Sequence, residues 1–308
     1  MIVLSLFDGI SCGRVALDRA GIEVSKYYAC EIEKNAIKVS AKNYPTILQL
    51  GDVQTAVLPD SIDLLIGGSP CQDLSIAKKD RKGLEGDRSG LFWEYVRIKN
   101  ELKPKYFILE NVASMPKKDK DIITREMGVE PVMFNASLVS AQCRKRLFWT
   151  NIKFELPEDR GIVLKNILQD DAEVDDRMIT KNHKAFCLDA SYYKGSSMEH
   201  TIQRKARTMV KLGHIGNSNA QGNRVYSVDG KSVCLSANGG GLGAKTGLYE
   251  INGIRKLTPI ECERLQGLPD NYTDGIANTN RYKCLGNAFN VDVIAHILKS
   301  IPNVYDHL

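Results

Sequence analysis

The residue best suited to covalent chemistry is Cys71, which lies in the run GGSPCQDLS at residues 67–75. This run follows the largely apolar residues 62–66. Such a stretch closed by two glycines predicts a buried strand that ends in a tight turn. The turn would hold a thiol at the edge of a sheet, where a nucleophile belongs. A buried structural cysteine is the alternative, because free cysteines are among the most buried residues.

Two carboxylates, Glu31 and Asp52, follow the second and third predicted strands, and the first strand runs into the turn FDGISCG at residues 7–13. A glycine-bearing turn of this kind brings backbone N–H groups and a helix N-terminus toward a ligand. Glu31 lies 18 residues after Gly13, close to the spacing of about 20 at which an acid binds a ribose hydroxyl in nucleotide-binding folds. The pair would suit a ribose and an adenine amine, although each acid alone could equally cap a helix.

Glu110 comes directly after the apolar residues 106–109, so its carboxyl group should be partly buried and able to donate a proton. Arg144 and Arg146 alternate in the run QCRKR at residues 142–146, and a strand would place both on one face. They could bind a substrate carbonyl or phosphate in a bidentate manner. Alternating arginines on a surface strand more often meet solvent.

Strand-like and helix-like segments alternate over the first 155 residues. This alternation predicts right-handed βαβ units and a mostly parallel sheet, and therefore an α/β fold. Residues 131–137 and 146–152 are predicted to pair as an antiparallel addition to that sheet. The predicted strands are residues 2–6, 25–29, 47–50, 62–66 and 106–109, and the predicted helices are residues 14–20, 33–41 and 91–102.

Residues 155–252 differ in character from the rest. Gly, Ser and Asn cluster at residues 213–219 and 238–243, which favours loops. Between residues 177 and 245 there are 11 Lys or Arg against 3 Asp or Glu, in a chain whose net charge is +5. A concentration of positive charge suits a polyanion, because each cation set against a phosphate releases counterions. We interpret this segment as a second, smaller, loop-rich domain, with a merely solvated basic face as the alternative.

Regular structure is predicted to resume at Thr258. The run TPIE at residues 258–261 is a capping box with proline at the first helical position, and Gly267 is expected to end that helix. A last amphipathic helix is predicted over residues 288–301.

The overall composition is that of a globular protein, with 43% apolar and 26% charged residues. No run approaches the roughly 20 apolar residues of a membrane span, and the N-terminus has no signal-peptide pattern. The absence of a C-x-x-C pair favours reduced thiols over disulfides or a zinc site, so no metal is expected. The eight cysteines are at positions 12, 30, 71, 143, 187, 234, 262 and 284.

Taken in order, these motifs resemble those of the DNA cytosine-5 methyltransferases. The resemblance covers nearly the whole chain except about residues 155–252. Ser11 and Cys12 stand where many bacterial members carry glycine, and the FDGI and SPCxDLS runs are more similar to the eukaryotic de novo enzymes. The matching runs are FDGISCG at 7–13, PCQ at 70–72, ENV at 110–112, QxRxR at 142–146, RKLT through ERLQG at 255–267 and GNA at 286–288.

The resemblance implies a Rossmann-like S-adenosylmethionine-dependent methyltransferase fold, with a catalytic domain of residues 1–154 and 254–308 and a target-recognition domain of residues 155–253. It implies methyl transfer to carbon 5 of cytosine in double-stranded DNA, with S-adenosylhomocysteine as the second product. Cys71 would form a covalent adduct with a flipped-out base. Glu110 would bond the ring at N3 and the exocyclic amine, Arg144 would hold the O2 carbonyl, and Arg146 belongs to the same motif.

The resemblance also assigns residues to the two ligands. The segment after the nucleophile has four Lys or Arg between residues 78 and 82 and three glycines up to Gly90. It predicts a mobile loop that closes over the flipped base, with Ile76 or Ala77 entering the gap. The cofactor residues are Phe7, Asp8, Gly9, Ile10, Gly13, Glu31, Ile32, Asp52, Val53, Leu91, Asn287 and Ala288. The DNA residues of this loop are Ser75, Ile76, Ala77, Lys78, Lys79, Arg81 and Lys82. Outside the resemblance, the basic residues Arg204, Arg207, Arg224 and Lys245 are candidate DNA contacts from their charge alone, since contacts to phosphate are commoner than contacts to bases.

Three other functions remain as alternatives. Some relatives of this family methylate cytosine in transfer RNA, and the basic segment suits either polymer. A catalytically silent DNA-binding homologue is disfavoured because the motif positions are filled, and a dehydrogenase because the turn is not G-x-G-x-x-G. We expect a monomer in the cytoplasm of a prokaryotic cell or phage-infected host, without a membrane partner and with a cognate restriction endonuclease as a candidate partner.

Overall fold

The computed structural model describes residues 1–70, 89–169, 228–232 and 257–302, together with the backbone of four short strands between residues 211 and 255. The chain divides into two compact units. The first unit comprises Met1–Phe134, Lys145–Leu156 and Phe289–Leu308, and the second comprises Asn135–Arg144 and Pro157–Ala288. Each unit is described separately below.

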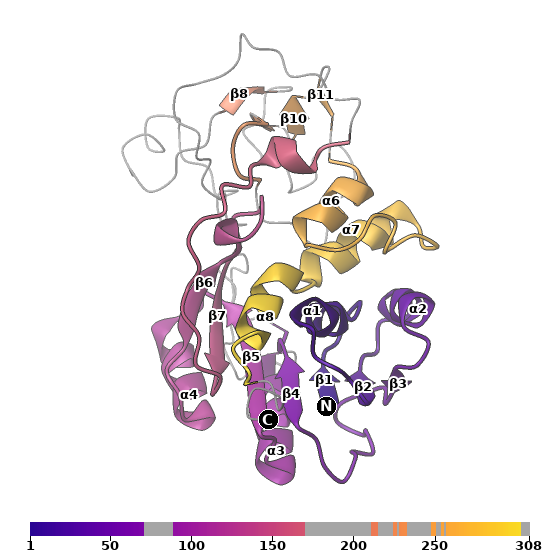
Figure 1. Ribbon diagram of the computed structural model, residues 1–308, viewed down its shortest axis with the longest axis vertical. Helices are drawn as coiled ribbons and strands as arrows, with labels where there is room; N and C mark the ends of the chain where they lie inside the picture. The colour runs from indigo at the N-terminus through magenta and orange to yellow at the C-terminus, as the bar shows by residue number, and fades with distance from the viewer. Residues whose placement is uncertain are drawn as a thin grey trace. The chain divides into compact units, whose positions relative to one another are not determined.

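The first unit is built on a seven-stranded sheet with the order β3-β2-β1-β4-β5-β7-β6 (Figure 1). Strand β1 pairs in parallel with β2 and β4, β4 pairs in parallel with β5, and β5 pairs antiparallel with β7. The predicted parallel sheet and its antiparallel addition are therefore confirmed. The strands are β1 (Ile2–Leu6), β2 (Lys26–Cys30), β3 (Leu48–Gln49), β4 (Leu64–Gly67), β5 (Tyr106–Val112), β6 (Val132–Asn135) and β7 (Lys145–Thr150).

Helices follow several of these strands, as the alternation predicted. Helix α1 (Cys12–Ala20) ends at Gly21, which adopts a left-handed conformation with a φ of 74°. Helices α2 (Lys34–Asn43) and α3 (Phe92–Leu102) also match predicted helices. Helix α8 (Val291–Leu298) packs beside α1 (Figure 1), where Arg19 and Asp292 form an ion pair of 2.8 Å. This contact brings the end of the chain against its beginning.

Helix α4 (Lys117–Met127) was not predicted from the sequence. Seven of its eleven residues are charged, so it lacks a wide apolar stripe. Ile123 and Met127 are buried one turn apart and attach it to the core of the first unit. Tertiary packing therefore stabilises a segment whose own pattern is weak.

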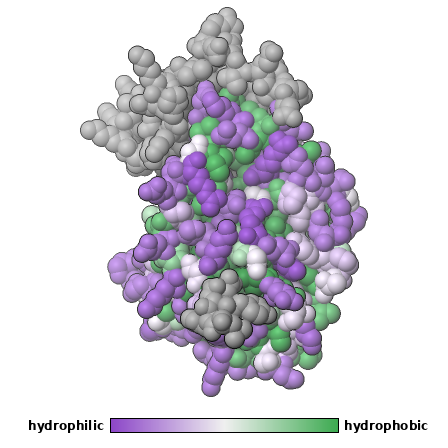
Figure 2. All heavy atoms as spheres, in the orientation of Figure 1, coloured by the Kyte–Doolittle hydropathy of each residue, from purple (hydrophilic) through white to green (hydrophobic). Residues whose placement is uncertain are grey.

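The core of the first unit lies on both faces of the parallel strands. Leu4 and Leu65 lie side by side on one face, Val3 and Leu64 lie side by side on the other, and all four are fully buried. Continuous apolar runs are typical of parallel strands that are covered on both faces. On the face of the molecule drawn in Figure 2, hydrophilic side chains of the described residues are interspersed with apolar ones. No helix in the described part of the chain is long and apolar enough to cross a bilayer.

The described residues of the second unit include a four-stranded sheet and the helices α6 and α7. The sheet has the order β11-β10-β9-β8. Strand β8 includes Gly213 and His214, which had been predicted to lie in a loop; pairing with β9 holds them in a strand despite the glycine. The elements are β8 (Lys211–His214), β9 (Arg224–Tyr226), β10 (Leu248–Glu250), β11 (Ile254–Arg255), α6 (Pro259–Leu265) and α7 (Asn278–Asn287).

The capping box at the start of α6 is confirmed. The Glu261 N–H donates to Thr258 Oγ1 at 3.2 Å, and the Thr258 N–H donates to Glu261 Oε2 at 2.8 Å. The last helix, predicted over residues 288–301, is confirmed as α8, although it begins later, at Val291, and ends earlier, at Leu298. Asn290 caps the N-terminus of α8, because its side-chain oxygen accepts a hydrogen bond from the Val293 N–H at 3.2 Å.

Candidate active site

The structure describes the chain up to Pro70, one residue before the predicted nucleophile. Cys71 therefore lies outside the described residues. For Arg224 the structure describes only the backbone, within β9. The other predicted DNA residues that lie outside the described ranges are Ser75, Ile76, Ala77, Lys78, Lys79, Arg81, Lys82, Arg204, Arg207 and Lys245.

The backbone that leads to Cys71 is held by a buried amide from β5. Asn111 is 1% exposed, and its Nδ2 donates to Ser69 Oγ at 3.1 Å and to the Ser69 carbonyl at 3.4 Å. Strands β4 and β5 are neighbours in the sheet, and Gly67 lies opposite Leu109. The asparagine of the ENV run thus positions the residue two places before the predicted nucleophile.

Glu110 lies inside β5 and forms an ion pair with Arg146 of β7. The distance between Glu110 Oε1 and Arg146 Nε is 2.7 Å, and the side chains are 12% and 17% exposed. The prediction that Glu110 closes its strand is wrong, because β7 pairs with the strand as far as Val112. Val112 lies opposite Arg146, so the arginine reaches diagonally across the two strands to the carboxylate.

The other oxygen of Glu110 lies against the turn after β4. A Cβ added to Gly68 would lie 3.0 Å from Glu110 Oε2 and 2.8 Å from Cε1 of Phe289. Both distances are shorter than ordinary van der Waals contacts, so the turn needs a glycine. Phe289 was not among the predicted site residues, although it directly follows the GNA run.

Arg144 does not share a strand face with Arg146, contrary to the prediction. It belongs to the second unit, and β7 begins one residue later at Lys145. Its guanidinium is 5% exposed and donates to the carbonyls of Gly286, at 3.4 Å, and Ala288, at 3.0 Å. The GNA run therefore supplies backbone acceptors for the first arginine of the QxRxR run.

The turn after β1 is tied to Glu31 at the end of β2. The Gly9 N–H donates to Glu31 Oε2 at 2.8 Å, and the Ile32 and Glu33 N–H groups donate to Oε1 at 2.8 Å each. An added Cβ on Gly9 would meet nothing within 4 Å, so the turn is open beside the carboxylate. Ile32 is 69% exposed and offers an apolar side chain there.

The remaining predicted cofactor residues divide between the two units. Phe7, Val53 and Leu91 pack against the core of the first unit, where Asp8 and Ile10 are also buried. Asp52 is exposed after β3 and accepts from the Gln54 N–H at 3.0 Å. Gly13 is buried in α1, where an added Cβ would lie 3.0 Å from Tyr27 Oη. Asn287 and Ala288 belong to the second unit, in which Asn287 is exposed and Ala288 is buried.

Two of the other cysteines are poorly suited to nucleophilic attack. Burial raises the pKa of the Cys30 thiol to about 12, and it raises the pKa of the fully buried Cys262 further. The thiolate is the reactive form, so neither competes with Cys71. Within the described ranges, no group of three or more His, Cys, Asp or Glu side chains is arranged to hold a metal ion.

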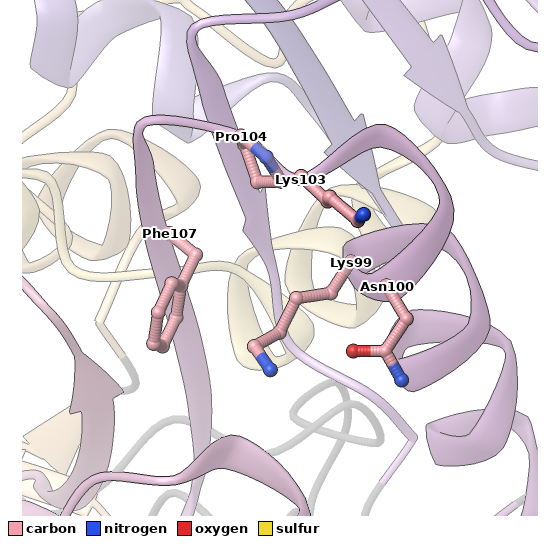
Figure 3. A pocket seen from close by; sticks show the side chains of 5 residues that line it. All are labelled: Lys99, Asn100, Lys103, Pro104 and Phe107. Atoms are coloured by element: carbon pink, nitrogen blue, oxygen red, sulfur yellow. The ribbon is translucent and has the colours of Figure 1, made fainter.

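A surface hollow of about 430 Å³ lies elsewhere on the first unit (Figure 3). It is lined by the end of α3 and the start of β5, whereas Glu110 lies further along β5. Lys99 points toward the ring of Phe107, 5.4 Å from its centre, and its Nζ also donates to the Glu126 carbonyl at 3.4 Å. The lining residues are Lys99, Asn100, Lys103, Pro104 and Phe107. None is a predicted site residue.

The fold is that of the Rossmann-like methyltransferases. The solved structure of the methyltransferase EhMeth of Entamoeba histolytica matches with a TM-score of 0.66 and 17% identity, covering 97% of each chain. That of a DNMT2 mutant of Spodoptera frugiperda matches with a TM-score of 0.65 and 18% identity, covering 97% of this chain and 98% of the other. The predicted fold class is thus confirmed.

The sequence comparisons define the family. The family model for C-5 cytosine-specific DNA methylase matches residues 1–303. The type II methyltransferase M.HhaI of Haemophilus parahaemolyticus is 31% identical, over 97% of this chain and 93% of that protein. The orphan methyltransferase M.SPRI of Bacillus phage SPR is 25% identical, over 98% of each.

The chain belongs to the C-5 cytosine-specific DNA methylase family. It is a DNA cytosine-5 methyltransferase, and the methyl donor of this family is S-adenosylmethionine. The predicted enzyme class is therefore confirmed.

Proposed function

We propose that this enzyme methylates carbon 5 of cytosine in double-stranded DNA through a covalent adduct between Cys71 and a flipped-out base. The observation that carries the proposal is the Glu110–Arg146 ion pair, which lies against the turn that leads to Cys71. The carboxyl group of Glu110 and the planar guanidinium of Arg146, side by side near this turn, could hydrogen-bond to the polar atoms of a pyrimidine ring. Asn111 supports the arrangement by holding Ser69.

In the proposed reaction, the Cys71 thiolate adds to carbon 6 of the ring and makes carbon 5 nucleophilic. Glu110 bonds N3 and the exocyclic amine, which relieves the charge that develops on addition. When bound, S-adenosylmethionine supplies a methyl group on a sulfonium. A water then accepts the proton from carbon 5, and the Cys71–carbon 6 bond breaks to release the methylated base.

We assign the contact with the O2 carbonyl to Arg146 rather than to Arg144. Arg146 already touches Glu110, so both groups can face one ring. Arg144 donates to the carbonyls of Gly286 and Ala288 within the second unit. Its buried guanidinium suits a structural role within that unit, namely holding the backbone of the GNA run.

In the first unit, the ends of strands β1 to β3 offer groups that suit S-adenosylmethionine, the methyl donor. Glu31 offers a fixed carboxylate for ribose hydroxyls, because three backbone N–H groups hold it in place. The exposed Ile32 offers an apolar contact for a purine ring, and the exposed Asp52 offers an acceptor for an amine. Phe7, Asp8, Gly9, Ile10, Gly13, Val53, Leu91, Asn287 and Ala288 complete the proposed set.

We further propose that residues 1–154 and 254–308 form the catalytic domain and residues 155–253 the target-recognition domain. The concentration of Lys and Arg between residues 177 and 245 supports a DNA-facing role. A base inside a duplex cannot reach a nucleophile, so the loop after Cys71 is proposed to close over a flipped nucleotide. We propose a cytoplasmic monomer that protects DNA from a cognate restriction endonuclease, a role suggested by the similarity to the type II methyltransferase M.HhaI.

The test is methyl transfer from labelled S-adenosylmethionine to unmethylated genomic DNA and, separately, to total transfer RNA. We expect label in DNA that disappears with Cys71→Ser, while that variant still binds DNA. Duplex DNA containing 5-fluorocytosine should trap the adduct, because fluorine cannot leave as a proton. Label only in RNA would change the proposed substrate, and an active Cys71→Ser enzyme would overturn the mechanism.

A further inference from the structure

The turn between β1 and α1 carries unusual backbone conformations. Phe7, Gly9 and Ser11 all have positive φ angles, of 57°, 61° and 61°. A left-handed conformation is costly for a residue with a Cβ and costs glycine almost nothing. Something other than intrinsic preference must therefore hold Ser11 in this conformation.

A buried carboxylate supplies that restraint. Ser11 Oγ donates to Asp8 Oδ2 at 2.5 Å, and Tyr27 Oη donates to Asp8 Oδ1 at 2.8 Å. Ser11 Oγ is also 2.6 Å from Ser40 Oγ on α2. Asp8 is 5% exposed, and Ser11 and Ser40 are fully buried. Burial raises the pKa of Asp8 to about 6, opposed by the hydroxyl hydrogen bonds and reinforced by the charge of Glu31.

Asp8 is also connected to the predicted ribose-binding carboxylate. The Asp8 N–H donates to the carbonyl of Cys30 at 3.1 Å, which ties the exit of β1 to the end of β2. The next residue, Gly9, donates its N–H to Glu31 at 2.8 Å. A change in the turn at Ser11 would therefore move one of the three groups that hold Glu31.

We propose that Asp8 is a positioning residue for the cofactor: through the Ser11 and Tyr27 hydroxyls it holds the left-handed turn that keeps Gly9 bonded to Glu31. The hydrogen-bonded Asp–Ser pair thus holds Ser11 in a conformation that glycine would adopt without restraint. The inference rests on the proposed function of Glu31 in binding S-adenosylmethionine. It adds a role for a buried acid that acts on the cofactor site through the backbone of the turn.

The test compares two substitutions that remove the same hydroxyl. Ser11→Ala keeps the Cβ and loses the restraint, so the loop should leave the binding-competent conformation part of the time and weaken the apparent affinity. We expect the Kd for S-adenosylhomocysteine, measured by calorimetry, to rise about threefold to tenfold. Ser11→Gly tolerates the positive φ and should recover most of that loss. Ser25→Ala, an exposed serine bonded to the Met1 carbonyl, is the matched control.

A second variant tests Asp8 without emptying its site. Asp8→Asn keeps the shape of the side chain but replaces one acceptor oxygen with a donor, so it cannot accept from both hydroxyls. The loss of affinity should be several-fold in the wild-type background and smaller in the Ser11→Gly background. Such non-additivity is expected only if Asp8 acts through Ser11.

The kinetic readout separates positioning from general damage. A positioning role predicts a higher KM for S-adenosylmethionine with little change in kcat or in the KM for DNA. Equal losses in Ser11→Ala and Ser11→Gly, or additive effects of Asp8→Asn, would overturn the inference. If the wild-type enzyme binds no S-adenosylmethionine, the proposed function itself is wrong. If it binds and methylates DNA but Ser11→Ala behaves like wild type, only this inference fails.

Discussion

The Glu110 carboxylate lies 2.7 Å from Nε of Arg146, across the antiparallel pair that joins β5 to β7. The two residues are distant in sequence and come from separate motifs of the chain, ENV and QxRxR. Their contact is largely shielded from solvent and brings the two motifs together at one place in the sheet. The effects of changing either residue should therefore appear in the chemical step.

Replacing Glu110 by glutamine should slow turnover by about two orders of magnitude or more, because an amide cannot relieve the charge that develops on the ring in the way proposed for the carboxyl group. The measurement is single-turnover methylation with saturating DNA and S-adenosylmethionine. DNA affinity should change little, and the thermal midpoint serves as the control for folding. Full activity in Glu110→Gln would remove this residue from the mechanism.

The two arginines should respond differently to lysine. Arg146→Lys loses the planar fork beside Glu110 and should lower kcat at least about tenfold with a nearly unchanged thermal midpoint. Arg144→Lys loses donors to two buried carbonyls and should lower stability by about 1–3 kcal/mol. Both are measured by kinetics and by denaturant unfolding, with the exposed Arg125→Lys as control. The reverse pattern would mean that Arg144, and not Arg146, binds the O2 carbonyl of the cytosine.

Gly68→Ala should impair catalysis more than folding. The new methyl group would press on Phe289 and on the Glu110 carboxylate, moving the acid from its place beside the turn. We expect at least about a tenfold loss of kcat, since small misplacements of catalytic groups are costly. Because the shortest approach is to the Phe289 ring, adding Phe289→Leu should restore part of the activity. No recovery in the double variant would mean that Phe289 is not the source of the strain.

Asp8 should make stability depend on pH. Its pKa is about 6 in the folded protein against an ordinary value of 3.8, so the folded state binds a proton more tightly than the unfolded state. The free energy of unfolding should therefore fall as pH rises from about 4 to about 6, by about 3 kcal/mol from this group. Asp8→Asn removes that dependence.

The check on Asp8 is urea unfolding of wild type and Asp8→Asn at pH 4.5 and pH 7.5. The variant should gain stability relative to wild type at the higher pH, while losing affinity for the cofactor as argued above. A constant difference between the two proteins across this range would show that Asp8 titrates with an ordinary pKa.

The sequence alone determined the parallel sheet, its antiparallel addition and the motifs along its edge. These depend on local features: apolar runs of strand length, glycines that stop elements, and the capping box at Thr258, which α6 reproduces. Such signals act over a few residues, so a single sequence displays them. The weakly patterned helix α4 shows the limit, because packing of Ile123 and Met127 stabilises it.

Tertiary structure decided which motif residues meet. Arg144 and Arg146 look equivalent in the sequence, yet the start of β7 at Lys145 sends one to the carbonyls of the GNA run and the other to Glu110. Ser11 looks like a departure from a glycine motif, and its contacts with the buried Asp8 and with Ser40, on the distant helix α2, explain how it is held in place. These outcomes depend on strand register and on contacts between residues far apart in the chain, which no local pattern encodes.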